Sequence, residues 1–425
     1  MTNRIFVPQN LYFMNSEHIF YVIIGILTAQ FTFDQWLDFL NNRKVVTSIP
    51  TELEGIYDEE KYKKQQNYKK ANYSFGLLSE VVSFLVIMIV LFNEGFAILN
   101  SWIVDFTSNL TLQSLLFFAI IGIASSLISL PFSIYGTFVI EERFGFNKIT
   151  PKIFVLDMIK SMLLSVLIGG PLMALVIWLY NIAGSYFWLY AWMVISGFAI
   201  FMTMFCTSLI LPLFNKQTPL ENGELRDAIE AFSVKAGFKL DNVFVMDGSK
   251  RSTKANAFFS GLGSRKRIVL YDTLINDLQT DEIVAVLAHE IGHYKLKHTL
   301  WGTLTGVLQM GVILFVFGLI VGSPLLSQAL GVHVPNFHIG ILAFGILYTP
   351  VSFVAGIFMT ILSRKNEYAA DAYACKFELG NALIGGLKTI SSNALSNLTP
   401  HPFYVFFHYS HPPLLQRIKA IKNIK

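Results

Sequence analysis

The sequence His289-Glu290-Ile291-Gly292-His293 brings two imidazoles and a carboxylate together at a spacing that suits metal chemistry. Residues four apart on a helix lie one turn apart on the same face, so both imidazoles can reach a single ion while Glu290 projects beside it. In a chain this long, His-Glu-x-x-His arises by accident with a probability on the order of one per cent. The alternative is a pair of surface histidines. We predict one catalytic zinc ion per chain, held by His289 and His293, with Glu290 as the general base.

Catalytic zinc needs a third protein ligand and one open position. The elongated metzincin motif would require Gly and His where this chain has Leu296 and Thr299. His298 is one residue out of register, and we predict that it is a solvated residue at the membrane interface. Glu282 lies about two turns before His289, roughly 10 Å along the helix axis, which is too far to share the ion.

Glu367 is the predicted third ligand because of the expected chain path. We expect the metal-binding helix to run straight into an apolar span, and a second span to return the chain so that Glu367 emerges at the same membrane face. Asp371 lies one helical turn further on and is predicted to accept the second N–H of a ligating histidine. The alternative for Glu367 is an ordinary acid beside the membrane that pairs with Arg364 or Lys365.

The composition excludes an ordinary soluble protein: 53% of the residues are hydrophobic, 14% are charged, and the mean hydropathy is +0.53. A membrane crossing takes about 20 apolar residues. Seven stretches reach that length, at 19–37, 77–99, 115–140, 154–180, 187–214, 300–321 and 339–362. We therefore predict an α-helical polytopic membrane protein with seven transmembrane helices that are surrounded by the lipid bilayer.

The basic residues lie on one side of this predicted topology. The connections 100–114, 181–186 and 322–338 contain no Lys or Arg, and of 32 basic residues only Arg4 and Lys160 depart from the pattern. By the positive-inside rule, the amino terminus is external or lumenal and the catalytic site faces the cytoplasm. A bacterial inner membrane and the endoplasmic reticulum both fit. The net charge of +4 indicates little about partners, and no nucleic-acid partner is expected.

Four regions follow from these patterns: a five-span membrane block at 1–214, a soluble segment at 215–298, a two-span hairpin at 299–362, and a helical tail at 363–425. In the soluble segment an amphipathic helix and three short strands predict a small α+β module. These elements lie at 220–236, 243–246, 255–260 and 267–271. Thr280 is predicted to cap the helix that carries the metal motif.

Several further motifs, together with the metal motif, resemble the integral-membrane type I CAAX prenyl endopeptidases, which are zinc enzymes of the gluzincin class. The resemblance covers nearly the whole chain. Its motifs lie at 141–148 (EERFGFNK), 252–261 with the core NAFF, 266–274, 366–371 (NEYAAD) and 410–413 (SHPP).

The resemblance implies seven helices around a large water-filled chamber, with the zinc site capping its cytoplasmic end. It also implies that an edge strand containing Asn256, Ala257 and Phe258 pairs with an extended peptide substrate. An ordinary sheet strand is the alternative. His411 resembles a family residue near the scissile carbonyl, where it would stabilise an oxyanion, and Arg417 resembles a substrate-binding residue on the tail helix.

The metal motif predicts a zinc endopeptidase, and the resemblance implies that it removes the last three residues of farnesylated or geranylgeranylated C-a-a-X proteins. Other membrane-associated peptides are further expected substrates. If the host lacks prenylated proteins, quality-control proteolysis of membrane proteins is the alternative. A seven-span receptor or transporter that binds zinc, and an inactive membrane scaffold, are alternatives from other classes.

Overall fold

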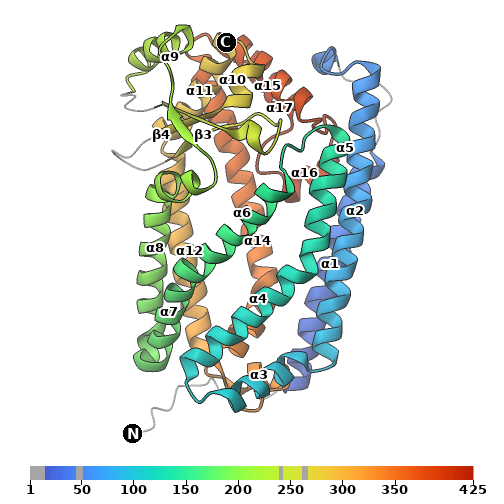
Figure 1. Ribbon diagram of the computed structural model, residues 1–425, viewed down its shortest axis with the longest axis vertical. Coiled ribbons are helices and arrows are strands. Elements are labelled where there is room, and N and C mark those ends of the chain that lie inside the picture. The colour runs from blue at the N-terminus through green and yellow to red at the C-terminus, as the bar shows by residue number, and fades with distance from the viewer. Residues whose placement is uncertain (1–14, 45–50, 239–242, 261–266, 425) are drawn as a thin grey trace.

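Long helices with a small sheet at one end make up the protein (Figure 1). The structure, a computed structural model, describes residues 15–44, 51–238, 243–260 and 267–424. The helices that precede the sheet are α1 (Ser16–Arg43), α2 (Glu59–Phe92), α3 (Gly95–Phe106), α4 (Leu110–Tyr135), α5 (Glu142–Phe144), α6 (Pro151–Leu164), α7 (Gly170–Ala183) and α8 (Phe187–Leu209). The later helices are α9 (Glu224–Lys235), α10 (Asp272–Asp277), α11 (Thr280–Lys295), α12 (His298–Ile320), α13 (Pro324–Ala329), α14 (Phe337–Cys375), α15 (Gly380–Asn393), α16 (Pro402–His408) and α17 (Leu414–Lys422).

Six helical stretches among the described residues are long and apolar enough to cross a membrane. They are Ser16–Arg43, Glu59–Phe92, Leu110–Phe144, Pro151–Leu213, His298–Ile320 and Phe337–Cys375. The longest stretch reverses direction at Gly184–Tyr186, where Gly184 adopts a φ of +51°, and α7 and α8 then lie side by side (Figure 1). The prediction of a polytopic helical membrane protein is therefore confirmed.

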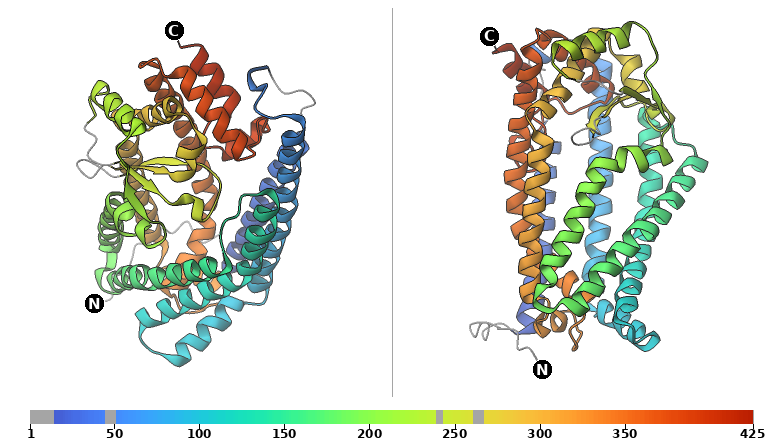
Figure 2. Two further views of the ribbon diagram at one scale, coloured as in Figure 1. Left: turned by 45° about the horizontal axis from the view of Figure 1, so that its top comes forward. Right: turned by 90° about the vertical axis from the view of Figure 1, so that its left-hand side faces the viewer.

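The second predicted span, 77–99, is wrong at its carboxyl end. Helix α2 ends at Phe92, and Glu94 adopts a left-handed φ of 50° before α3 begins at Gly95. The turn falls at Asn93-Glu94-Gly95, a short polar break between two apolar runs that the predicted span bridged. Helix α3 instead crosses the end of the bundle opposite the sheet (Figure 2).

The sheet has the strand order β1-β2-β4-β3, from β1 (Gln217–Pro219), β2 (Val243–Met246), β3 (Ala257–Ser260) and β4 (Arg267–Tyr271). Strand β2 runs parallel to β4, and the other two pairings are antiparallel. The predicted ranges of β2 and β4 are correct, β3 is shorter than predicted, and β1 was missed because three residues carry too little pattern. Among the described strands, β3 is an edge.

Helix α11 packs against β3 and α15 through a continuous apolar face. Ile283, Leu287 and Ile291 recur every four residues and are almost completely buried. The N-cap of this helix is Gln279 rather than the predicted Thr280, which is the first helical residue. The Gln279 side chain accepts from the third residue of the helix, and Glu282 accepts from the Gln279 backbone N–H, which satisfies two amides.

Helix α11 does not run straight into the next span, as the sequence suggested. It ends at Lys295, Lys297 adopts a left-handed φ of 60°, and α12 begins at His298. Helices α12 and α14 then form a hairpin that returns the chain to the sheet end of the molecule (Figures 1 and 2). This path brings the carboxyl-terminal part of α14 against α11.

Candidate metal centre

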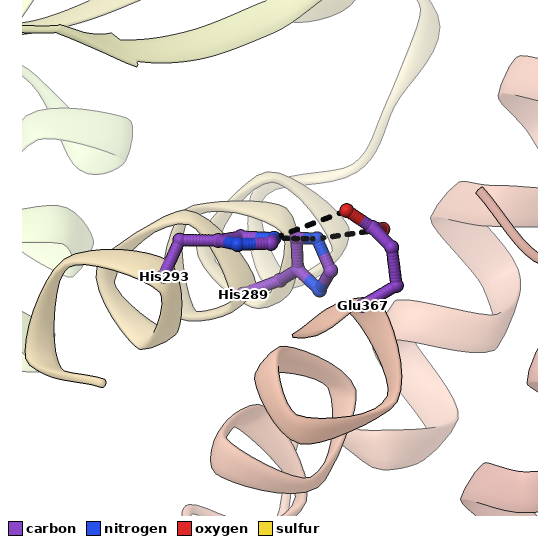
Figure 3. A group of neighbouring side chains, drawn as sticks. All are labelled: His289, His293 and Glu367. Atoms are coloured by element: carbon purple, nitrogen blue, oxygen red, sulfur yellow. Dashed lines mark hydrogen bonds and ion pairs between the residues drawn. The ribbon is translucent and has the colours of Figure 1, made fainter. Parts of the chain in front are cut away.

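His289, His293 and Glu367 converge where α11 meets α14 (Figure 3). The two Nε2 atoms lie 3.1 Å apart. Glu367 Oε2 lies 3.5 Å from Nε2 of His289, and Glu367 Oε1 lies 3.3 Å from Nε2 of His293. One donor atom from each residue falls within 4.8 Å of the others, so the three can surround a single ion.

The donor set fits a divalent metal ion. His289 and Glu367 are buried, and Glu367 Oε2 has no hydrogen-bond partner. A buried carboxylate oxygen without a partner is costly, and a bound cation would remove that cost. Two imidazole nitrogens and one carboxylate, with room for a further ligand, are the usual donors of a catalytic zinc site.

Gly292 allows α11 and α14 to approach this closely. A Cβ at this position would lie 3.0 Å from Cβ of Tyr373 and 3.2 Å from Cα of Ala370, which are tight contacts. Glu367 lies on the same helix as both neighbours, one turn before Ala370. The glycine inside the histidine motif therefore sets the distance at which Glu367 meets the histidines.

Asp371 and Arg417 support the far side of the His289 ring. His289 Nδ1–H donates to Asp371 Oδ1 at 2.9 Å, which leaves Nε2 free to bind a metal. Arg417 donates to the same carboxylate through Nε (2.9 Å) and Nη2 (2.6 Å). Its Nη1 lies 3.6 Å from Glu367 Oε2. Helix α17 is thereby linked to the candidate metal ligands.

The pKa of His289 reflects these neighbours. Burial opposes protonation of the ring, but the hydrogen bond to Asp371 and the nearby Glu367 carboxylate outweigh that effect and raise the pKa to about 9. The ring therefore lies in a strongly negative environment, which favours a cation, whether a proton or a metal ion.

A cavity of about 980 Å³ opens beside the three ligands. The residues predicted to act on a substrate all line it: Asn256, Ala257, Phe258, Glu290, His411 and Arg417. Nε2 of His411 lies 3.4 Å from Glu367 Oε1, and its side chain is 65% exposed. Arg417, by contrast, is buried with its donors directed at Asp371.

His298 is the site residue that the sequence analysis assigned wrongly. We expected a solvated residue, but its Nδ1 lies 3.0 Å from Nδ1 of His293, and it lines the cavity. The cause is the left-handed turn at Lys297, which separates α11 from α12. A left-handed lysine has no sequence signal, because glycine or asparagine normally marks that conformation.

Such a fold and site define a membrane metallopeptidase: a polytopic helical bundle carries a His-Glu-x-x-His motif that, with a glutamate from a distant helix, can hold a metal ion.

Known proteins agree with this class. The family model described as "CAAX prenyl protease N-terminal, five membrane helices" matches residues 38–216, and the model of "Peptidase family M48" matches residues 219–425. The chain is 35% identical to CAAX prenyl protease 1 of Saccharomyces cerevisiae, with 95% of each chain covered. It is 36% identical to the CAAX prenyl protease 1 homolog of Arabidopsis thaliana, over 94% of this chain and 96% of the relative. The chain belongs to peptidase family M48, within the CAAX prenyl protease 1 family.

A solved structure supports the same assignment. The crystal structure of Ste24p from S. mikatae matches with a TM-score of 0.90 and 35% identity, over 95% of this chain and 99% of that chain. The protein is thus a multi-pass membrane metalloprotease, which confirms the family predicted from the sequence. The receptor, transporter and inactive-scaffold alternatives are set aside.

Proposed function

We propose that the protein is a zinc endopeptidase in which His289, His293 and Glu367 hold one zinc ion. When bound, zinc supplies a Lewis acid for the scissile carbonyl. Glu290 lines the cavity next to His289 and acts as the general base that takes a proton from the attacking water, then passes it to the leaving amine. His411 Nε2, 3.4 Å from the Glu367 carboxylate, donates to the oxyanion.

We propose that Asp371 fixes the His289 tautomer through its 2.9 Å hydrogen bond, with Arg417 holding the Asp371 carboxylate in place. Burial supports this assignment, since Asp371 is completely buried and Arg417 nearly so. Substrate contact by Arg417 is a second, smaller part of its role, because its side chain also reaches the cavity wall.

The substrate class is the C-a-a-X protein, from which the enzyme removes the last three residues after prenylation. The names of the yeast, plant and human relatives support this substrate class, since each is a CAAX prenyl protease 1 or its homolog. A quality-control role without prenyl substrates has no comparable support.

Strand β3 presents the edge that would bind an extended substrate. Tyr271 N–H donates to the Asn256 carbonyl, so in an antiparallel ladder the next residue, Ala257, directs its N–H and C=O away from β4. The Asn256 side chain accepts a hydrogen bond from the Ala257 N–H at 2.8 Å. This bond satisfies the Ala257 N–H until a carbonyl of the bound peptide takes the place of the Asn256 side chain. Phe258 supplies a neighbouring side chain of the same cavity.

For the membrane arrangement we propose seven crossings, because the stretch Pro151–Leu213 reverses once and so crosses twice. The five-helix description of the matched amino-terminal family agrees with a block at 1–214, followed by the segments 215–298, 299–362 and 363–425. A second cavity of about 670 Å³, lined by α1, α2 and the segment 391–414, also reaches His411, which supports a chamber at the sheet end of the bundle.

The distribution of basic residues supports a cytoplasmic catalytic face and an external or lumenal amino terminus. Relatives in yeast, plants and humans favour the endoplasmic reticulum over a bacterial inner membrane.

The test is cleavage of a farnesylated C-a-a-X peptide by the purified full chain. Mass spectrometry measures the released tripeptide, and metal analysis measures the zinc content of the protein. Glu290→Gln should keep about one zinc per chain yet lower cleavage by about 10²- to 10⁴-fold. Glu282→Gln on the same helix is the matched control, because glutamine preserves the capping box. If Glu290→Gln releases tripeptide at the wild-type rate, the general-base assignment is wrong.

A further inference from the structure

His298 stands next to the candidate metal centre because the helix breaks before it, between α11 and α12. On an uninterrupted helix, a residue five positions after His293 would point about 140° away from it. Lys297, with its φ of 60°, breaks the helix and turns His298 back toward the motif. The rings of His293 and His298 then meet edge to face, with centroids 5.0 Å apart.

The contact joins two nitrogens that cannot both be acceptors. His293 turns Nε2 toward Glu367 Oε1 and toward Nε2 of His289, so Nε2 is its metal-binding atom. A neutral imidazole that binds through Nε2 carries its proton on Nδ1. That proton points at Nδ1 of His298, 3.0 Å away, which must therefore accept the hydrogen bond and carry its own proton on Nε2.

We propose that His298 is a positioning residue that accepts a hydrogen bond from Nδ1–H of His293 and so fixes the tautomer and orientation of this ligand. The inference rests on the metal ligands of the proposed function. His298 does for His293 what Asp371 does for His289, whose Nδ1–H donates at 2.9 Å. Partners of this kind typically change metal affinity or activity by about 10- to 100-fold when they are removed.

The two partners differ in charge, and the surroundings explain the difference. Asp371 is a carboxylate whose charge is balanced by Arg417 at 2.6 Å. His298 accepts the same kind of bond without adding another negative charge beside Glu367. A neutral partner at this position would leave a bound metal ion a stronger Lewis acid than a second carboxylate would.

Two variants distinguish the hydrogen bond that His298 accepts from the packing of its ring. His298→Phe keeps a planar ring at the start of α12 but removes the acceptor, whereas His298→Asn keeps an acceptor oxygen near the place of Nδ1. His333, an exposed histidine outside the site, provides the matched control His333→Phe.

The measurements are zinc affinity by competition with a chromophoric chelator, the visible spectrum of the cobalt(II)-substituted protein, and the melting temperature, all on the full chain. His298→Phe should weaken zinc binding by about 10- to 100-fold and shift the cobalt spectrum, while His298→Asn and His333→Phe stay near wild type. With the farnesylated peptide, His298→Phe should lower kcat and leave KM unchanged.

Equal zinc affinity and an unchanged cobalt spectrum in His298→Phe would overturn the inference, although the proposed function would survive. An equal loss of affinity and melting temperature in both His298 variants would also overturn it, because the ring would then only pack the helix junction. A wild-type chain that binds no zinc would instead reject the proposed ligands themselves.

Discussion

Arg417 and Asp371 form a buried bidentate ion pair, with Nε 2.9 Å from Oδ2 and Nη2 2.6 Å from Oδ1. The pair joins α17 to α14, and Asp371 in turn accepts from His289. Three segments that are distant in sequence therefore depend on one carboxylate.

Replacing Arg417 with Met should destabilise the protein by about 3–5 kcal/mol, because Asp371 would remain buried without its partner. Zinc affinity should also fall. Thermal unfolding in detergent and chelator competition measure these effects. The control is Arg226→Met, whose pair with Glu230 is exposed and contributes less than about 1 kcal/mol. A variant Arg417→Met with normal stability and metal binding but a raised KM would assign Arg417 to substrate binding alone.

Removal of the metal should abolish cleavage and lower the melting temperature. A ligand present at 1,000 times its Kd stabilises the folded state by about 4 kcal/mol, and Glu367 Oε2 would lose its partner when the ion leaves. Dialysis against a chelator, followed by one equivalent of zinc, should reverse both effects. Full cleavage by the chelated protein would exclude the proposed metal-dependent chemistry.

Gly292→Ala should weaken metal binding even though alanine favours helices by about 1 kcal/mol. The added Cβ would press on Tyr373 and Ala370 at 3.0–3.2 Å and move α14, which carries Glu367, away from α11. Overpacking of this kind costs about 1–3 kcal/mol. Zinc affinity and melting temperature are the measurements.

The control for this glycine is Gly306→Ala on α12, where a Cβ meets no atom within 4 Å. Its zinc affinity should equal that of the wild type. If Gly292→Ala also binds zinc normally, the approach of the two helices does not determine the metal site.

Ala257→Pro should impair substrate binding without disturbing the metal. The Ala257 N–H is bonded to the Asn256 side chain and not to β4, so its loss leaves the sheet ladder intact. A peptide that adds to β3 would lose one hydrogen bond, worth about 0.5–1.5 kcal/mol, which raises KM up to about tenfold.

The comparison for Ala257→Pro is Ala257→Val, which keeps the N–H and suits a strand. Steady-state kinetics with the farnesylated peptide distinguish the two variants. Equal KM values for both would contradict pairing of the substrate with this edge.

Local patterns were sufficient to predict much of this protein. The four-residue spacing of His289 and His293 is a property of any α-helix, and the length of each apolar stretch depends only on bilayer thickness. The two strands at 243–246 and 267–271 could be predicted because each is a short run of residues with high strand propensity between turns. The return of Glu367 to the same membrane face follows from counting spans.

Tertiary structure alone decided how these pieces meet. Packing between segments far apart in the chain decides the close approach of Gly292 to Tyr373, the contact of Arg417 from α17, and the left-handed turn at Lys297. Sequence by itself determined which side chains were available to bind a metal, since that depends on residue type and local period. Their partners were decided by the fold, because a hydrogen bond between distant segments exists only once the helices have packed.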